Sequence, residues 1–243
     1  DTHILWNNFY EYVFSKAPFI DFYITATDLQ NKILSEQFKK YTSYQPRIRT
    51  IPVGSLQQLN YPKEHRQPYS MLTASRLASE KHVDWIVKAA IKAKKEVPKL
   101  RFDIYGYGGE KSNIENIIKE NHAEDYIQLK GHVNLDDIYV NYELFVSAST
   151  SEGFGLTLME AVGSGLGMIG FEVNYGNPTF IEEGKNGYLI PIDKDNQNIE
   201  DITDSMAKKI IQYFNKGLTR PHDMSYKIAK PYETTNITQK WQN

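Results

Sequence analysis

Between Tyr69 and Ile190 the chain alternates short apolar runs with segments whose apolar residues recur at helical spacing. Such alternation is typical of an α/β fold in which helices join parallel strands. The expected architecture is a Rossmann-like, doubly wound parallel sheet, which binds ligands at the carboxyl ends of its strands. The expected strands are Tyr69–Ala74, Arg101–Tyr105, Ile127–Leu129, Leu144–Ala148, Met168–Phe171 and Tyr188–Ile190. The expected helices lie around Val83–Ile91, Ile114–Asn121, Leu135–Asn141, Gly155–Ser164, Pro178–Glu183 and Ile199–Phe214.

The first part of the chain does not belong to this repeat. Phe22–Thr25 and Ile48–Val53 read as strands, and Thr27 with Gln30 forms a capping box that opens a helix between them. We therefore expect residues 1–54 to be the last βαβ piece of a preceding Rossmann-like domain. Residues 55–68 are an expected linker, residues 69–230 the ligand-binding domain, and residues 231–243 a tail whose helix packs back toward the first domain. A first residue other than Met suggests that the printed sequence is the C-terminal part of a longer protein.

Composition excludes several classes of function. With 243 residues, 40% of them hydrophobic, the chain can bury a large core. A formal net charge of -2 argues against nucleic acid as a partner. The absence of cysteine excludes disulfides, thiolate zinc sites and a cysteine nucleophile, and the six histidines lack metal-ligand spacing. No apolar run is long enough for a membrane span and no signal peptide is visible, so we expect a cytoplasmic protein.

The strongest functional signal is a glycine-rich loop between two glutamates. Glu152 is followed by Gly153, Phe154 and Gly155, and Glu160 lies eight residues after Glu152 on the expected helix. Backbone N–H groups at such a helix start can bind a phosphate, while the carboxylates suit sugar hydroxyls on either side of it. Paired carboxyl groups of glycosidases lie about 5–9.5 Å apart. Eight helical residues would span about 12 Å, which favours a nucleotide-sugar site over a glycosidase pair.

These residues resemble a known family. The spacing Glu152-x7-Glu160, preceded by Arg76 and Lys81 in SRLASEKHVDW, is similar to that of the GT-B glycosyltransferases, and among them to the retaining family 4. The segments YGYGGEKSNIENI, IQLKGHV and GKNGYLIP lie where that family has its other recurring blocks, so the resemblance covers about residues 22–243. Further segments, ILWNNFYEYVF, FEVNYGNPTFI and YETTNITQKWQ, resemble the protein O-GlcNAc transferases that prime serine-rich repeat adhesins in accessory Sec systems. Teichoic-acid α-GlcNAc transferases share much of this pattern.

The resemblance implies a role for each residue. Arg76 and Lys81 would grip the diphosphate and stabilise the leaving UDP, in place of a metal ion. Glu160 would bind the ribose hydroxyls, and Glu152 would lie beside the anomeric centre of the donor sugar. The family usually has an acidic residue where Tyr107 stands. The backbone amides expected at the phosphates are those of Gly153, Phe154, Gly155 and Leu156, and the residues expected near the nucleobase are Gly106, His132 and Val133.

The implied activity is retaining transfer of GlcNAc from UDP-GlcNAc to Ser or Thr of a serine-rich repeat adhesin, without a metal cofactor. The resemblance also implies a paralogous, stabilising glycosyltransferase-like subunit, bound through a preceding N-terminal part, and a cytoplasmic location that extends to the inner face of the membrane. We expect the printed sequence to bind UDP and to transfer sugar poorly by itself. The alternatives are a teichoic-acid α-GlcNAc transferase, a non-catalytic pseudo-glycosyltransferase subunit and an epimerase-like enzyme of the same fold.

Overall fold

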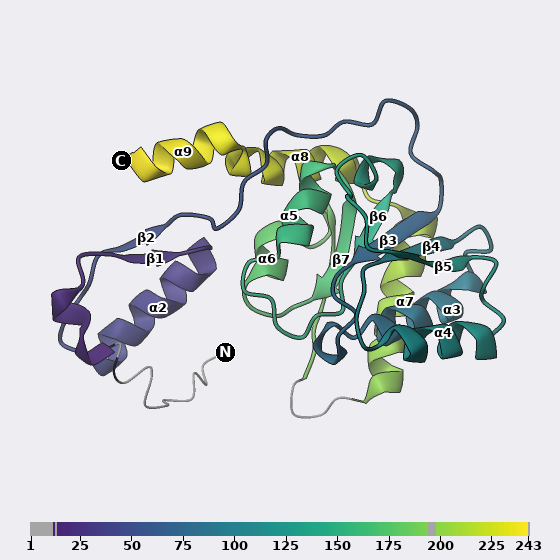
Figure 1. Ribbon diagram of the computed structural model, residues 1–243, viewed down its shortest axis with the longest axis horizontal. Helices are drawn as coiled ribbons and strands as arrows, with labels where there is room; N and C mark the ends of the chain where they lie inside the picture. Colours follow the sequence, from purple (N-terminus) through teal and green to yellow (C-terminus); the bar gives the residue numbers. More distant parts are fainter. Residues whose placement is uncertain (1–11, 13, 194–197, 243) are drawn as a thin grey trace.

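The larger part of the molecule is built on one parallel sheet. The computed structural model describes residues 12, 14–193 and 198–242. In the large sheet the strand order is β5-β4-β3-β6-β7-β8, and every neighbouring pair is parallel (Figure 1). The predicted fold class, a doubly wound parallel sheet, is confirmed. The strands are β3 (Ser70–Ala74), β4 (Arg101–Tyr105), β5 (Ile127–Gly131), β6 (Leu144–Val146), β7 (Gly167–Phe171) and β8 (Gly187–Ile190).

Helices cover both faces of this sheet, and each face has its own apolar core. Met71 and Leu72 are adjacent on β3 and fully buried, yet they belong to different cores, because successive side chains of a strand point to opposite faces. Helices α3, α4 and α7 pack in the core of Met71, and α5, α6 and α8 pack on the other face. The bounds are α3 (Val83–Lys94), α4 (Lys111–Glu120), α5 (Leu156–Gly163), α6 (Gly176–Phe180), α7 (Ile199–Lys216) and α8 (Pro221–Ala229).

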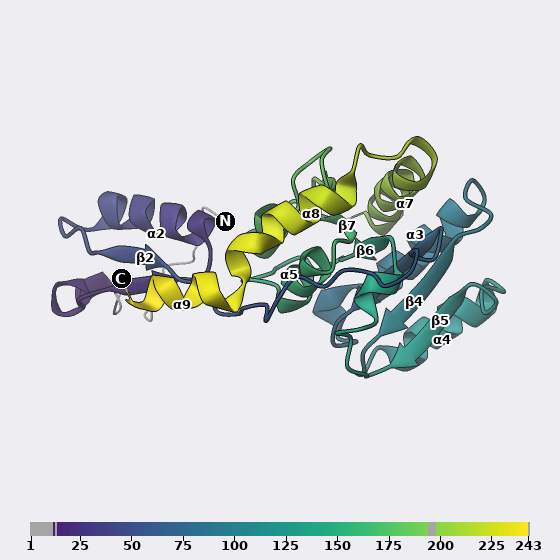
Figure 2. The ribbon, with the colours of Figure 1, turned by 90° about the horizontal axis from the view of Figure 1, so that it is seen from above.

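A smaller unit precedes the large sheet. After the short helix η1 (Ala17–Phe19), its two parallel strands, β1 (Tyr23–Thr25) and β2 (Ile48–Thr50), are joined by α2 (Asp28–Tyr41). The predicted capping box at the start of α2 is confirmed. The tail forms α9 (Thr234–Gln242), which lies on the side of this small sheet opposite α2 in both views (Figures 1 and 2). The domain boundaries drawn from the sequence stay a prediction.

The expected helix over Leu135–Asn141 is wrong. Only its end is helical, as the short helix η3 (Tyr139–Asn141). The Asn134 side chain accepts a hydrogen bond from the Asp136 N–H at 2.9 Å, and the Leu135 carbonyl accepts from Ile138 at 2.8 Å. Such local side-chain bonds and i to i+3 backbone bonds favour tight turns over an α-helix.

Two further boundaries differ from expectation. The helix expected at Pro178–Glu183 is α6, which ends at Phe180 because the Asn186 side chain donates to the Phe180 carbonyl at 2.9 Å and accepts from the Glu182 N–H at 2.7 Å. Helix α8 was not predicted, although Pro221 stands at its first position, where proline is favoured. The remaining elements are the short helices η2 (Ser79–Lys81), between β3 and α3, and η4 (Lys230–Tyr232), between α8 and α9.

Two segments connect the small and large units, and they lie side by side. Leu56 donates its N–H to the Tyr232 carbonyl at 2.8 Å, and Thr234 donates its N–H to the Leu56 carbonyl at 2.7 Å. Leu56 and Glu233 thereby form an isolated parallel bridge. The outgoing segment and the returning tail are joined where the chain crosses between the units.

The expected linker is also fixed to the large unit through Arg66. Its half-buried guanidinium donates to three backbone carbonyls, those of Val140 at 3.0 Å, Tyr142 at 2.8 Å and Ser164 at 2.7 Å. Burial lowers the pKa of Arg66 from its usual value. Arg66 therefore holds the linker against η3 and the end of α5.

We predict that Arg66→Met lowers the free energy of unfolding by about 2–4 kcal/mol, because three carbonyls lose a charged donor while the apolar stem is kept. Urea denaturation followed by circular dichroism measures the change. Lys63→Met, at an exposed position of the same linker, is the matched control and should change stability by less than about 0.5 kcal/mol. Equal losses in the two variants would contradict a specific role for Arg66.

Candidate active site

The predicted site residues gather at the point where the chain reverses direction across the large sheet. From β3 the chain builds β4 and β5 on one side, then crosses to β6 on the other side of β3. The loops that follow β3 and β6 therefore diverge from neighbouring strands and leave a crevice, which is where open α/β sheets bind ligands. Arg76 and Lys81 follow β3, and Glu152 follows β6.

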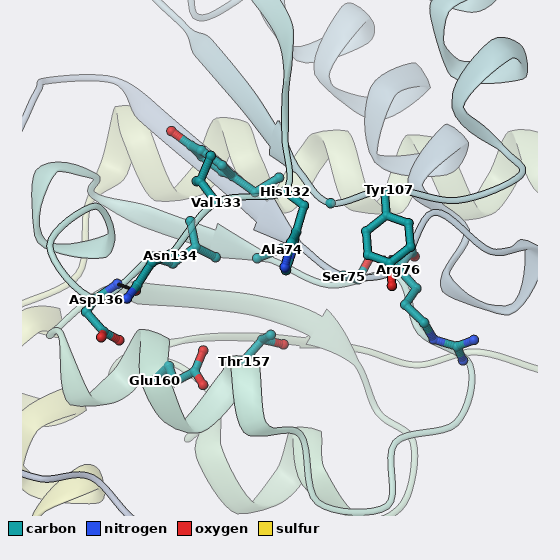
Figure 3. A pocket seen from close by; sticks show the side chains of 13 residues that line it. Ala74, Ser75, Arg76, Tyr107, His132, Val133, Asn134, Asp136, Thr157 and Glu160 are labelled. Carbon is teal, nitrogen blue, oxygen red and sulfur yellow. Dashed lines mark hydrogen bonds between the residues drawn. The ribbon is translucent and has the colours of Figure 1, made fainter.

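A cavity of about 400 Å³ opens at this edge (Figure 3). Five of the predicted residues line it, namely Arg76, Gly106, His132, Val133 and Glu160. Glu160 and Thr157 lie beside each other on α5, and Arg76 lies at the far end of the lining (Figure 3). The other lining residues are Ala74, Ser75, Tyr105, Tyr107, Asn134, Leu135 and Asp136.

Gly106 brings two of these loops together. Its φ is +142°, and a Cβ there would lie 1.8 Å from the Ser75 carbonyl oxygen, so only glycine fits. Its N–H donates to the Gly131 carbonyl at 2.8 Å. The ring of Tyr107, which stands at the family's acidic position, contacts the edge of His132 with 5.4 Å between centroids. The backbone geometry at Gly106 thus sets this wall of the cavity.

Glu160 carries a carboxylate that is partly withdrawn from water. Burial raises its pKa, while the hydroxyl of Tyr139, which donates to Glu160 Oε2 at 3.1 Å, lowers it. Burial and the neighbouring Glu160 raise the pKa of Tyr139 well above its usual value, so Tyr139 remains a donor. One face of the carboxylate is fixed by Tyr139, and the rest is directed into the cavity (Figure 3).

Lys81 and Glu152 form a sheltered ion pair outside the cavity lining. Lys81 Nζ lies 2.8 Å from Glu152 Oε2, and each side chain is only 19% exposed. The backbone of Glu152 is fixed as well, because it donates to the Asn174 carbonyl at 3.3 Å and accepts from the Gly176 N–H at 2.8 Å. The pair therefore ties the loop after β3 to the loop after β6.

Arg76 is held differently from Lys81. Its side chain is 69% exposed, and its guanidinium lies 2.9 Å from Glu80 Oε1. An exposed pair four residues apart contributes only a few tenths of a kcal/mol, so Arg76 can exchange Glu80 for another anion at little cost. The two predicted cations thus stand on the same loop, one sheltered against a carboxylate and one at the surface.

The glycine loop leaves a row of backbone donors unused. Gly155 caps α5 with φ +86°, and the buried Phe154 ring packs against Phe180 and Tyr232. In the part of the chain that the structure describes, nothing accepts a hydrogen bond from the N–H groups of residues 153–158. These six donors stand at the positive end of the α5 dipole, an arrangement that attracts anions.

Sequence reasoning missed two side chains of the site. Thr157 lines the cavity and precedes Glu160 by three residues, so helical spacing could have placed both on one face. Tyr139, the partner of Glu160, gave no such signal, because only the packing of η3 beneath α5 brings it there.

Neither a metal centre nor a membrane span is found within residues 12, 14–193 and 198–242. No group of three or more His, Asp or Glu side chains there could hold a metal ion. The helices of the same residues are too short or too polar to cross a bilayer.

Comparison with known proteins identifies the family. The family described as "Glycosyl transferases group 1" matches residues 58–229, which hold the large sheet and the cavity. The chain belongs to the group 1 glycosyltransferases. The predicted resemblance to retaining GT-B glycosyltransferases is confirmed at the level of the family and the fold. The supporting segment ILWNNFYEYVF lies almost entirely outside the described residues.

Among group 1 glycosyltransferases, the chain is similar to one named "UDP-N-acetylglucosamine--peptide N-acetylglucosaminyltransferase GtfA subunit" from Streptococcus pneumoniae. The two are 56% identical in an alignment 243 residues long, which covers 99% of this chain and 48% of the relative. A poly(ribitol-phosphate) alpha-N-acetylglucosaminyltransferase of Staphylococcus aureus is 33% identical in an alignment 194 residues long, which covers 76% of this chain and 38% of the relative. The chain spans about half the length of the curated relatives it matches.

Two solved structures of this family superpose closely. The crystal structure of the pneumococcal O-GlcNAc transferase GtfA in complex with UDP and GlcNAc gives a TM-score of 0.91 at 55% identity and covers 99% of this chain and 47% of that one. The crystal structure of a GtfA/B complex gives 0.94 at 54% identity, over 98% and 47% of the two chains. The predicted similarity to the protein O-GlcNAc branch is confirmed, and the teichoic-acid enzyme is more distant.

We predict that Tyr139→Phe raises the pKa of Glu160 further, because burial remains while the hydroxyl that stabilises the carboxylate is lost. Carbon-13 NMR of labelled glutamates, assigned with Glu160→Gln, should place the wild-type pKa above the ordinary 4.5 and the variant higher still. Between the pKa of Glu160 in the unfolded chain and its higher pKa in the folded protein, the folded state holds a proton that the unfolded chain has released. The contribution of Glu160 to stability therefore falls as the pH rises through this range.

Tyr142→Phe is the matched control. It also removes a tyrosine hydroxyl from the core that contains Tyr139, but this hydroxyl contacts Asp103 and Tyr105. The Glu160 pKa should stay at its wild-type value in that variant. A Glu160 pKa that is unchanged by Tyr139→Phe would show that the 3.1 Å contact contributes nothing in solution.

Proposed function

We propose that this chain is the donor-binding half of a retaining glycosyltransferase that moves GlcNAc from UDP-GlcNAc to Ser or Thr of a serine-rich protein. The observation that carries the proposal is the row of six unpaired N–H groups at residues 153–158, between Glu152 and Glu160. Relatives about half identical to the chain bear the corresponding name, and one of them is described with UDP and GlcNAc.

In this proposal each group of the site binds one part of the donor. The N–H groups of Gly153, Phe154, Gly155 and Leu156 bind the phosphates, and Glu160 accepts hydrogen bonds from the ribose hydroxyls. The loops that carry Gly106, His132 and Val133 contact the nucleobase. Arg76 leaves Glu80 and binds the diphosphate, since two oxygens of a diphosphate offer the planar guanidinium a better fit than one exposed carboxylate.

The chemical step replaces one bond at the anomeric carbon with another on the same face. The bond to the diphosphate oxygen breaks, the acceptor hydroxyl oxygen attacks from that side, and the departing diphosphate takes the hydroxyl proton. Arg76 and Lys81 stabilise the negative charge that develops on UDP, so no metal ion is required. Glu152 stabilises the positive charge of the oxocarbenium-like state, and Lys81 holds its carboxylate in place.

The rest of the active site lies outside these residues in the proposal. A preceding part supplies the acceptor cleft, and a paralogous stabilising subunit binds there; a solved structure similar to this chain is described as a GtfA/B complex. The enzyme works in the cytoplasm, at or near the inner face of the membrane, where an unfolded serine-rich acceptor is accessible before export.

We predict that UDP binds more tightly than GDP or ADP, and that Arg76→Ala weakens UDP binding about 10- to 150-fold, the equivalent of one charge-assisted hydrogen bond of roughly 1.5–3 kcal/mol. Isothermal titration calorimetry measures both. Lys95→Ala, at an exposed position of the same charge, is the control and should bind like the wild type. Nucleotide binding by neither protein would support a non-catalytic partner subunit, and release of free sugar without an acceptor would indicate an epimerase-like enzyme.

We predict that no covalent sugar is attached to Glu152 during turnover. Glu152→Gln should reduce transfer strongly while UDP binding is retained, because the carboxylate acts on the sugar and not on the nucleotide. Rapid quenching and mass spectrometry of the peptide carrying Glu152 provide the test. A glycosyl adduct formed at a rate that matches turnover would replace front-face attack with a double displacement.

The acceptor separates this proposal from a teichoic-acid transferase. Incubation of the full enzyme with radiolabelled UDP-GlcNAc and equal amounts of a serine-rich peptide and poly(ribitol phosphate) compares the two directly. Label in the peptide alone supports the proposal, and label in the polymer alone overturns it.

A further inference from the structure

The small unit contacts the glycine loop through the side chain of Gln30. Gln30, in the first turn of α2, donates from Nε2 to the Gly153 carbonyl at 2.9 Å, across 123 positions of sequence. Gly153 is the first residue of the row of unpaired N–H groups. A residue outside the large sheet therefore contacts the backbone that faces the proposed phosphate site.

Gln30 is held at its other end by the capping box. Its Oε1 accepts from the N–H groups of Ala26 at 2.8 Å and Thr27 at 3.2 Å, and its own N–H donates to Thr27 Oγ1 at 3.1 Å. The amide is thus fixed before it meets Gly153, so little side-chain entropy is lost when the contact forms. The sequence predicts the capping box, but it does not predict the contact between the Gln30 Nε2 group and Gly153.

The contact sets the direction of a peptide plane. In a trans peptide the carbonyl of Gly153 and the N–H of Phe154 point in opposite directions. Holding the carbonyl toward α2 therefore directs the Phe154 N–H away from α2. Among the described residues, nothing lies within 4 Å of the position where a Cβ of Gly153 would be, so none of them packs against this peptide on that side.

Phe154 itself is fixed by a second contact near the same helix end. Its ring lies 5.9 Å from that of Tyr232, centroid to centroid. Burial, followed by the nearby charge of Asp28 in the first turn of α2, raises the pKa of Tyr232 to about 12. The Phe154 side chain is thus held by Tyr232 of η4, and the backbone of the loop is held by Gln30 of α2.

We propose that Gln30 is a positioning residue of the donor site, which orients the Gly153–Phe154 peptide so that the Phe154 N–H can bind a diphosphate. The inference rests on the proposed function of the loop and extends it to the small unit. Closure of the small unit on the large one and phosphate binding are then coupled through this hydrogen bond, because the peptide is correctly oriented only when α2 is in place.

Three variants of the full chain separate this role from capping. Gln30→Glu keeps the capping box, since glutamate accepts the same two N–H groups, but it cannot donate to Gly153. Gln30→Met removes donation without adding charge. Thr27→Ala removes a cap contact and leaves the Gln30 amide intact. UDP affinity is measured by calorimetry and the melting temperature by circular dichroism, in 0.1 M and 1 M NaCl.

We expect both Gln30 variants to bind UDP about fivefold more weakly than the wild type at both salt concentrations, the loss due to one neutral hydrogen bond. Thr27→Ala should lower the melting temperature and keep wild-type affinity. The proposal is overturned if both Gln30 variants bind normally, or if Thr27→Ala weakens binding equally. It is also overturned if only Gln30→Glu is impaired and recovers in 1 M NaCl, where charges are screened beyond about 3 Å.

A wild type that binds no UDP would refute the proposed function instead, and the role of Gln30 would be refuted with it. Normal UDP binding by the wild type together with normal binding by both Gln30 variants refutes the positioning role alone.

Discussion

The two-sided burial of the large sheet is the constraint on which the rest of the structure depends. Met71 and Leu72 are both fully buried, one on each face, which requires helices on both sides and therefore crossover connections between parallel strands. Parallel strands end at one edge, so every loop that carries a functional residue emerges there. The reversal between β3 and β6 then separates two of those loops and creates the cavity.

The charged side chains at this edge of the sheet differ in how far they are exposed to water. Lys81 and Glu152 neutralise each other where water is scarce, whereas Arg76 stays near the surface with an easily exchanged partner. The Glu160 carboxylate accepts a hydrogen bond from the Tyr139 hydroxyl. The site is therefore largely preorganised around the proposed phosphate and ribose positions, and Arg76, with its exposed partner, is free to respond to a ligand.

Much of this could be predicted from local sequence. Every strand of the large sheet was expected within a few residues, because apolar runs such as Leu144–Val146 leave little choice of structure. The Glu152–Glu160 spacing located the glycine loop correctly at the start of α5. What could not be predicted depends on contacts between distant segments: the turn that replaced the helix near Leu135, the hydroxyl of Tyr139 on Glu160, and the reach of Gln30 to Gly153.

The bridge between Leu56 and Glu233 has a mechanical consequence. The two segments that join the units are hydrogen-bonded to each other at this bridge. The bridge therefore resists separation and twisting of the two segments more than bending. Asn60, which donates its N–H to the Gly163 carbonyl, and Arg66 both anchor the outgoing segment to the large unit. A rotation of the small unit about this bridge changes distances to the large unit least at the bridge itself and more at the first turn of α2. A small rotation there would make or break the contact between Gln30 and Gly153 while the core of the large unit remains unchanged.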